Sequence, residues 1–230
     1  AVRIADYARR FQDKASLFTA ERLKYTGLRQ LITRRKQLVH DRVKHHKQMT
    51  DLNRCVEGQL QAVFARLDRR QIRLLDELIA QVDGMILDTI KSDPELHRLY
   101  RLILTVPGVG PVLAANLLAI TEGFTRFRKA RALSCHAGAA PYEHSSGTSI
   151  RGRTRVSPKA NQGLKALLHI SALSTIQREG ELRDYWIRKI AEGKHKMSIL
   201  NAIRNKIIHR VCAVVDRGTP YLAQNPLLMS

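Results

Sequence analysis

The chain has 230 residues, and its 40 Lys and Arg against 20 Asp and Glu give a formal net charge of +20. Such an excess of cations indicates a polyanionic partner, of which nucleic acid is the first candidate. The 3 separated cysteines form no Cys-x-x-Cys pair, which excludes a disulfide framework and a zinc site and indicates a reducing compartment, expected to be the cytoplasm with its nucleoid. No apolar run reaches the roughly 18 to 20 residues that span a bilayer, so no membrane partner is expected.

Residues 20–90 contain no proline and few glycines, which predicts long, almost unbroken helices. In the second half of this stretch apolar residues recur at short helical steps, as in one seam of a coiled coil or helical bundle. This seam is expected to pack either inside the chain or against a second copy of it. Its members are Val56, Leu60, Val63, Leu67, Leu74, Leu75, Leu78, Val82, Met85 and Ile90.

The first half of the same stretch is strongly basic, since its cations outnumber the two anions Glu21 and Asp41. Two interpretations stay open, a solvated helix face and a helix that faces nucleic acid. The adjacent His45 and His46 belong to this basic face, because neighbouring helical residues point in different directions and cannot chelate one metal alone. The nine cations are Arg22, Lys24, Arg29, Arg34, Arg35, Lys36, Arg42, Lys44 and Lys47.

Beyond Pro94, two apolar helices flank a Pro-Gly-Val-Gly turn at residues 107–110. This order is typical of a helix-hairpin-helix motif, although a plain helical corner has the same pattern. Gly108 and Gly110 are expected to adopt positive φ and so to permit a tight turn. The free amide groups at the start of the second helix are expected to hold a phosphate oxygen.

Residues 141–165 place two serines, Ser145 and Ser146, before Gly147 and follow them with five cations and no anion. Hydroxyls in a Gly-rich loop beside guanidinium groups suit a phosphate, because arginine supplies forked donors and glycine lets the backbone come close. The segment is therefore predicted to form a phosphodiester site, with a solvated connection as the alternative. The predicted phosphate-binding cations, upstream ones included, are Arg126, Arg128, Lys129, Arg151, Arg153, Arg155, Lys159 and Lys165.

Three further helices are expected at residues 162–175, 181–191 and 197–215, and Gly218 and Pro220 end the last of them. Arg204 is expected on the outer side of that last helix. The predicted fold class is mainly α, with a long helical coiled-coil arm followed by an all-helical domain that contains the helix-hairpin-helix motif.

Several motifs follow one another in a fixed order: residues 105–115, 124–131 and 137–142, then Ser145 to Gly147, then residues 156–165. Together they resemble the C-terminal domain of the insertion-sequence-110 family of bacterial transposases. The resemblance implies a DNA recombinase in which the serine directly before the glycine, here Ser146, attacks a scissile phosphate, with Ser145 as the fallback. It also implies a nucleic-acid contact at Asn161, DNA as the substrate, a structured guide RNA, and homo-oligomers assembled through the coiled coil.

The sequence also departs from the family pattern, since Pro158, Lys159, Ala160 and Lys165 stand where the family usually has other residues. Full-length members begin with a ribonuclease-H-like domain whose Asp-Glu-Asp-Asp set binds Mg²⁺. This chain is expected to start just after that set, so it is expected to hold no metal or cofactor itself. The expected division is a remnant of that domain at residues 1–20, the coiled-coil region at 21–98, the serine-bearing domain at 99–221 and a tail at 222–230.

Two functions stay open at this point. In the first, the chain is half of an enzyme of DNA transposition and recombination, in which Ser146 cleaves and rejoins DNA through a serine–phosphate intermediate. Such a half is expected to be inactive alone. In the second, the chain is a non-catalytic helical protein that binds nucleic acid.

Overall fold

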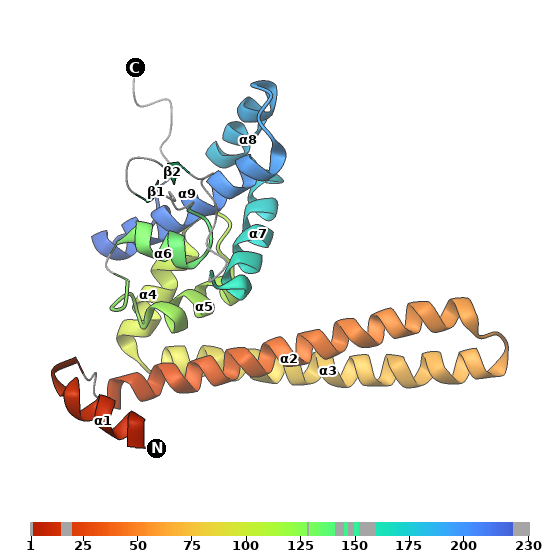
Figure 1. Cartoon of the computed structure of the whole chain (residues 1–230). Helices are drawn as coiled ribbons and strands as arrows, with labels where there is room; N and C mark the ends of the chain where they lie inside the picture. Colours follow the sequence, from red (N-terminus) through yellow and green to blue (C-terminus); the bar gives the residue numbers. More distant parts are fainter. Residues whose placement is uncertain are drawn as a thin grey trace.

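The computed structural model describes residues 2–14, 20–127, 129–140, 145–146, 150–151 and 160–222. This described part is helical apart from one short β-hairpin, which confirms the mainly α prediction. A long two-helix arm extends from one side of a body of shorter helices (Figure 1). Ahead of the arm lie α1 (Val2–Arg10) and a short 3-10 helix (Gln12–Lys14).

The arm consists of α2 (Ala20–Cys55) and α3 (Gln59–Lys91), which run antiparallel. Charged pairs fix their register: the Arg35 guanidinium donates to Asp83 at 2.5 Å. Arg42 donates to Asp76 at 2.8 Å. A step of one heptad along α2 therefore matches a step of one heptad back along α3, which keeps one seam of each helix facing the other.

The buried seam of α3 differs from the predicted one. The side chains that α3 buries are isoleucines, namely Ile72, Ile79, Ile86 and Ile90. Several members of the predicted seam are instead exposed, namely Leu60, Val63, Leu67, Leu74 and Met85. The prediction merged two apolar stripes of one helix. With about 100° per residue, the exposed stripe lies about 130° around the helix axis from the isoleucines. Only the isoleucine stripe faces α2.

Part of the basic face of α2 is used inside the chain, which corrects the interpretation of the whole face as solvated or bound to nucleic acid. Besides the two pairs with α3, Lys24 lies 2.7 Å from Asp93 and Arg29 lies 2.6 Å from Glu122. His45 also leaves that face, since its Nδ1 lies 3.5 Å from a carboxylate oxygen of the partly buried Asp68 on α3. Among the described side chains of α2, the cations that stay exposed are Arg34, Lys36, Lys44 and Lys47.

The described helices of the body are α4 (Pro94–Leu104), α5 (Pro111–Thr121), α6 (Ala130–His136), α7 (Gln162–Ile176), α8 (Glu181–Ala191) and α9 (Lys196–Arg217). The last three lie within two residues of their predicted bounds. Helix α9 contacts α4, α6, α7 and α8. Its inner face is fully buried at Ile203, Ile207 and Val211, so α9 is the element around which the body packs.

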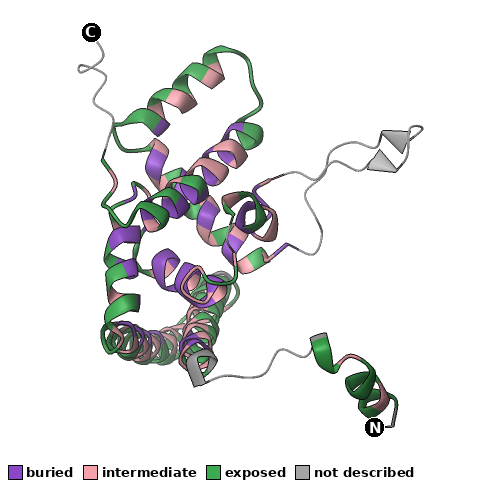
Figure 2. Cartoon of the chain, turned by 90° about the vertical axis from the view of Figure 1, so that its left-hand side faces the viewer, coloured by how far each residue is buried: buried purple, intermediate pink, exposed green. Residues whose placement is uncertain are grey.

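The base of the arm belongs to the core of the body. Tyr25 and Leu28 from α2, with Ile90 from α3, lie in the same buried apolar cluster as residues of α4, α5 and α9. Figure 2 looks along the arm and shows buried segments of α2 and α3 beneath those of the body. In addition, the Arg29 Nε donates to the Ala119 carbonyl at 3.0 Å. The arm is therefore attached to the body by both packing and hydrogen bonds.

Two helix ends show how local sequence sets these bounds. Asp93 caps α4, because one of its carboxylate oxygens accepts from the backbone amides of Glu95 and Leu96 at 3.1 and 3.0 Å. Its other oxygen accepts from Lys24, so one side chain both starts α4 and ties it to the arm. Gly218 ends α9 in the left-handed conformation, with φ of 68°, which confirms the predicted stop.

Candidate phosphodiester site

The segment that contains the two serines leaves the body after α6 and returns to it at α7. The backbone amide of Asn161 donates to the His136 carbonyl at 2.8 Å. Close by, the Asn201 side chain on α9 donates to the Ala139 carbonyl at 2.9 Å. Both ends of the segment are thus hydrogen-bonded to the body and lie beside each other.

Within this segment the structure describes the short strands β1 (Ser145–Ser146) and β2 (Ile150–Arg151), paired antiparallel. The register places Ser145 opposite Arg151, and Ser146 opposite Ile150. Arg151 is therefore the direct cross-strand partner of the fallback serine rather than of Ser146. Other predicted residues of the site lie outside the described residues, namely Arg128, Gly147, Arg153, Arg155 and Lys159.

Asn161, predicted to contact nucleic acid, has a structural task in this conformation. It is the N-cap of α7, and its side-chain oxygen accepts from the Leu164 amide at 3.0 Å. The capping oxygen leaves only the amide nitrogen of this side chain to meet a ligand. A direct contact between Asn161 and nucleic acid stays a prediction.

A cation of the arm reaches the same end of α7, which the sequence pattern did not indicate. The Lys36 Nζ lies 4.0 Å from the point that a Cβ on Gly163 would occupy. Gly163 belongs to the first turn of α7, where unpaired amides give the helix a partial positive charge. Lys165, one of the predicted cations, lies in the next turn and is half-buried. An ammonium group beside a positive helix end raises the local potential and favours an anion.

Arg126 and Lys129 are exposed on the connection from α5 to α6, as a phosphate contact requires. Arg126 lies 5.5 Å from the centre of the Phe127 ring, which in turn packs 5.1 Å from the His136 ring. Burial, with a smaller contribution from the Arg126 charge, lowers the pKa of His136 below its ordinary value. His136 is therefore neutral at pH 7.

The turn between α4 and α5 is packed against α7. Gly108 has φ of 86°, whereas Gly110 has φ of −97° and is the extended N-cap of α5, so only the first glycine adopts the predicted positive φ. The Ser171 hydroxyl donates to the Gly108 carbonyl, and a Cβ on Gly108 would overlap the Thr175 hydroxyl. The turn thus has a structural reason for its glycine, and its predicted phosphate contact stays a prediction.

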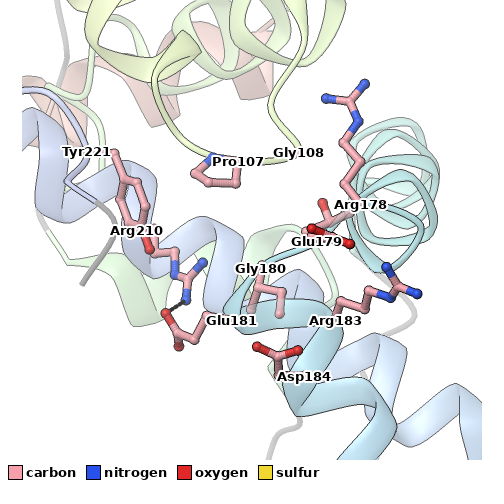
Figure 3. A pocket seen from close by; sticks show the side chains of 12 residues that line it. Pro107, Gly108, Arg178, Glu179, Gly180, Glu181, Arg183, Asp184, Arg210 and Tyr221 are labelled. Atoms are coloured by element: carbon pink, nitrogen blue, oxygen red, sulfur yellow. Dashed lines mark hydrogen bonds and ion pairs between the residues drawn. The ribbon is translucent and has the colours of Figure 1, made fainter. Parts of the chain in front are cut away.

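A cavity of about 390 Å³ lies on the far side of this turn, between Pro107 and the start of α8 (Figure 3). Cations and acids alternate around it. Arg210 pairs with Glu181 at 2.5 Å and lies 5.2 Å from the Tyr221 ring. The remaining charged residues that line it are Arg178, Glu179, Arg183 and Asp184. Because the two signs balance, this cavity is a poorer phosphate site than the end of α7.

Arg204 was predicted on the outer side of α9, and the structure places it inside. Its side chain is only 6% exposed, and its Nε donates weakly to the Leu200 carbonyl at 3.4 Å. Burial lowers the pKa of Arg204, yet arginine stays charged in proteins. No acid in the described part of the chain forms an ion pair with it. A buried charge lies one turn beyond Asn201, which anchors the serine-bearing segment.

Among the described residues, no group of three or more His, Cys, Asp or Glu is placed so that it could hold a metal ion. None of the helices that the structure describes is long and apolar enough to cross a membrane.

Comparison with known proteins assigns a class to this region. Residues 100–187, which enclose α5 to α7 and both serines, match the model of the transposase IS116/IS110/IS902 family. A 44.8 kDa protein of insertion element IS116 from Streptomyces clavuligerus is 33% identical over 138 residues, which cover 60% of this chain and 33% of that protein. A 42 kDa protein of insertion element IS900 from Mycobacterium paratuberculosis is 34% identical over 156 residues, which cover 66% of this chain and 38% of that protein.

A third relative comes from a different genetic setting. The pilin gene-inverting protein of Moraxella lacunata is 28% identical over 178 residues, which cover 77% of this chain and 55% of that protein. The fold and the matches define residues 100–187 as a helical transposase domain. Within the chain, these residues belong to the IS116/IS110/IS902 family of transposases, and the two relatives from insertion elements match 60% and 66% of its length. The chain spans between 33% and 55% of the length of the three relatives.

Proposed function

We propose that this chain supplies the serine-bearing half of a transposase that cleaves and rejoins DNA. The observation that carries the proposal is the position of the two serines. Ser145 and Ser146 lie inside the family match, on a segment whose two ends are hydrogen-bonded to one place on the body. A fixed attachment limits where a nucleophile can travel, and this lowers the entropy that is lost when it meets a phosphate.

In the proposed reaction the Ser146 oxygen bonds to the phosphorus of a DNA strand, and the displaced DNA oxygen leaves as a hydroxyl end. The serine–phosphate ester keeps the energy of the broken bond, so attack by another DNA hydroxyl restores the strand and frees the serine. Ser145 stays the fallback nucleophile, since the register pairs it with Arg151.

The surroundings of the segment favour a negatively charged substrate. No acid occurs between Glu143 and Glu179, whereas Arg and Lys are frequent there. Lys36 adds a positive charge from the arm at the first turn of α7. Such a cluster stabilises the charge that accumulates on a phosphate under attack. Transposition or inversion of DNA, as the names of the relatives state for those proteins, supplies a substrate of this kind.

Magnesium and a guide RNA are expected from the family resemblance alone. The described residues form no donor set that fits Mg²⁺. In the proposed enzyme its ligands therefore come from outside those residues, and we assign no step to the metal. A structured RNA would meet the same cationic surfaces as DNA, because both present phosphodiester backbones.

We also propose that the arm joins copies of the protein. The second apolar stripe of α3 is exposed along much of the helix, with Leu60, Leu67, Leu74 and Met85 each more than half exposed. An apolar row of this length on a helix that already has one packed seam is typical of a helix that contacts two partners. A stripe of a second copy would cover it.

The test of the catalytic proposal needs a protein that includes the metal-bearing part. This chain is joined to the preceding region of a full-length family member, and a labelled DNA substrate is added with Mg²⁺. The wild-type protein is expected to form a protein–DNA adduct that survives a denaturing gel. Ser146→Ala is expected to remove the adduct and to leave DNA binding within about twofold, because a methyl group replaces only the nucleophile.

Ser145→Ala is the matched control, and it is expected to keep the adduct. If only Ser145→Ala loses the adduct, the nucleophile is Ser145 and not Ser146. If the wild-type protein binds and cleaves DNA but every serine variant still forms the adduct, the serine mechanism is wrong. If it binds DNA and never forms an adduct, the chain belongs to a non-catalytic nucleic-acid-binding protein.

A further inference from the structure

The distal part of α3 carries four arginines whose charges are not used inside the chain. Arg66, Arg69, Arg70 and Arg73 lie at helical steps of three and four, so they form one continuous row. All four are exposed. In the described part of the chain none of them forms an ion pair, and Arg69 has only an intrahelical bond to the Ala65 carbonyl.

Three acids of α3 point away from the row. Asp68, Asp76 and Asp83 face α2, where they meet His45, Arg42 and Arg35. Glu77 is exposed one turn beyond Arg73 on the same side of the helix, and it marks the end of the row towards the body. The arm therefore uses these three carboxylates to hold its two helices together and presents the four guanidinium groups of the row to solvent.

Three of these arginines line a shallow groove of about 370 Å³ together with Ala62 and Val63. The row runs from Arg66 to Arg73, a rise of about 10 Å along the helix axis. One strand of a nucleic-acid duplex places a phosphate every 3.4 Å or so along the axis, so this row spans about three phosphates. Forked guanidinium groups at that spacing match a run of phosphates on one strand.

We infer that the arginine row of α3 is a second nucleic-acid contact, which binds the phosphodiester backbone of a duplex away from the serine-bearing segment. The row lies towards the free end of the arm (Figure 1). About 10 residues of α3 separate Arg73 from Asp83, the level at which the arm meets the body through Lys36 and Gly163, which is about 15 Å of helix. A duplex that contacts both surfaces would be held at points at least about four base pairs apart. The inference rests on the proposed action on nucleic acid but not on the serine chemistry.

Most of the arginine row lies beside the apolar stripe rather than on it. Taking Val63 as the origin, the stripe of Leu67 and Leu74 lies within about 40° of it, whereas Arg66, Arg73 and Arg69 lie about 60° to 120° away on the other side. Arg70 lies within about 20° of Val63, at the edge of the stripe. A second copy packed on the stripe would leave Arg66, Arg69 and Arg73 open to a nucleic acid that runs along the arm.

The experiment uses the full chain with all four arginines of the row changed to glutamine, which keeps a good helix former at each position. Circular dichroism checks that the helix content is unchanged. Binding to a DNA duplex of about 40 base pairs, which is long enough to cover both surfaces, is measured over a series of salt concentrations. The row variant is expected to bind at least tenfold more weakly at low salt. The slope of log affinity against log salt is expected to fall by about three units, since each lost phosphate contact removes about 0.9.

The control variant removes the same formal charge from exposed ion pairs elsewhere, as Arg10→Gln, Arg98→Gln, Arg188→Gln and Lys189→Gln. It is expected to change affinity by less than about threefold, because the acids Asp6, Glu95 and Glu192 beside those cations already offset most of their charge. Equal losses of affinity in both variants would show that only the net charge of the protein matters. No loss of affinity in the row variant would show that the row does not contact the nucleic acid. Either result overturns the inference.

Two further measurements distinguish DNA from RNA as the ligand, and a nucleic-acid contact from a protein interface. The same sequence as duplex DNA and as duplex RNA shows which backbone the row prefers, and a selective loss with either one supports the inference. If the row variant loses self-association and keeps its nucleic-acid affinity, the row is a protein interface and the inference is wrong. If the unmodified chain binds neither nucleic acid, the proposed function fails together with this inference; binding without a specific loss in the row variant removes this inference alone.

Discussion

The core helices of the body, such as α5 and α7, are more apolar than the helices of the arm, and the two regions are held together in different ways. The body buries residues such as Leu117, Leu168 and Ile203 completely. The arm has one narrow seam, and along it charged pairs such as Arg35 with Asp83 set the register. Apolar packing gives the body its stability, whereas exposed or partly exposed ion pairs stabilise by little and mainly select one alignment. Interaction surfaces that need to stay open are therefore easier to place on the arm.

The largest expected difference comes from removing one leucine from each region. Leu168→Ala, at a fully buried site of α7, is expected to reduce the free energy of unfolding by about 2 to 5 kcal/mol. Leu74→Ala, at a site of α3 that is 55% exposed, is expected to change it by less than about 0.5 kcal/mol. Urea unfolding followed by circular dichroism measures both. Similar losses at the two sites would mean that a second copy already buries Leu74 in solution.

The same position tests the proposed assembly. Leu74→Asp places a charge on the exposed stripe and leaves the isoleucine seam untouched. Sedimentation velocity is expected to show a smaller species than the wild-type protein, because a buried unpaired carboxylate opposes association. A wild-type protein that sediments as a monomer would refute the role of the stripe in self-association.

A second comparison concerns two glycines of one turn. Gly108→Ala is expected to cost roughly 2 to 4 kcal/mol, because the new Cβ meets the Thr175 hydroxyl and the backbone has positive φ. Gly110→Ala is expected to cost less than about 1 kcal/mol, because φ is negative there and no heavy atom lies within 4 Å of the new Cβ. Thermal unfolding of the two variants checks the order. Equal effects would contradict the packing of this turn against α7.

The smallest expected effect lies at the joint between arm and body. Hydrogen bonds from Lys24 and from the backbone amide of Leu96 lower the pKa of Asp93 below its ordinary value. A carboxylate with a lowered pKa stabilises the fold above its unfolded pKa of about 4, and this stabilisation is lost as the pH falls through the lower folded value. Asp93→Ala is expected to cost about 1 to 2 kcal/mol at pH 7, when the cap and the Lys24 pair are both lost.

Asp93→Asn separates these two losses, because asparagine still caps a helix but cannot pair with Lys24 as an anion. The gap in stability between the wild-type protein and Asp93→Asn is expected to close as the pH falls through the lowered pKa of Asp93. Unfolding measured from pH 7 to pH 2 follows that gap. A gap that is independent of pH would show that the carboxylate charge contributes nothing at this joint.

The sequence predicted most helices of the body well, because Pro94, Gly180 and Gly218 mark their ends chemically. It predicted the helical arm, but the predicted seam combined buried residues such as Ile90 with a second apolar stripe that is exposed. A helix with two apolar stripes gives the same short-range periodicity as a helix with one, and only the partner helix shows which stripe is buried. For the same reason the basic face of α2 was overestimated, since the acids that neutralise Arg29 and Lys24 are about 70 to 90 residues away in sequence.

The candidate site was predictable as a set of residue types and not as an arrangement. Ser145, Ser146 and the following cations stand out in the sequence, whereas the approach of Lys36 to Gly163 depends on how the arm joins the body. The burial of Arg204 was also missed, because an arginine among apolar residues of a helix ordinarily lies at the solvent boundary. The approach of Lys36 to Gly163 and the burial of Arg204 both depend on packing between residues far apart in the sequence, which local sequence patterns do not indicate.

The hydrogen bonds of Ala139 and Asn161 to the body have a consequence for how such a protein changes over time. Because the scaffold itself holds the two attachment points together, the free-energy cost of closing the intervening segment depends only weakly on the length of that segment. Changes in the number of residues between 141 and 159 that keep the two serines can therefore accumulate without loosening the helices to which the segment is attached.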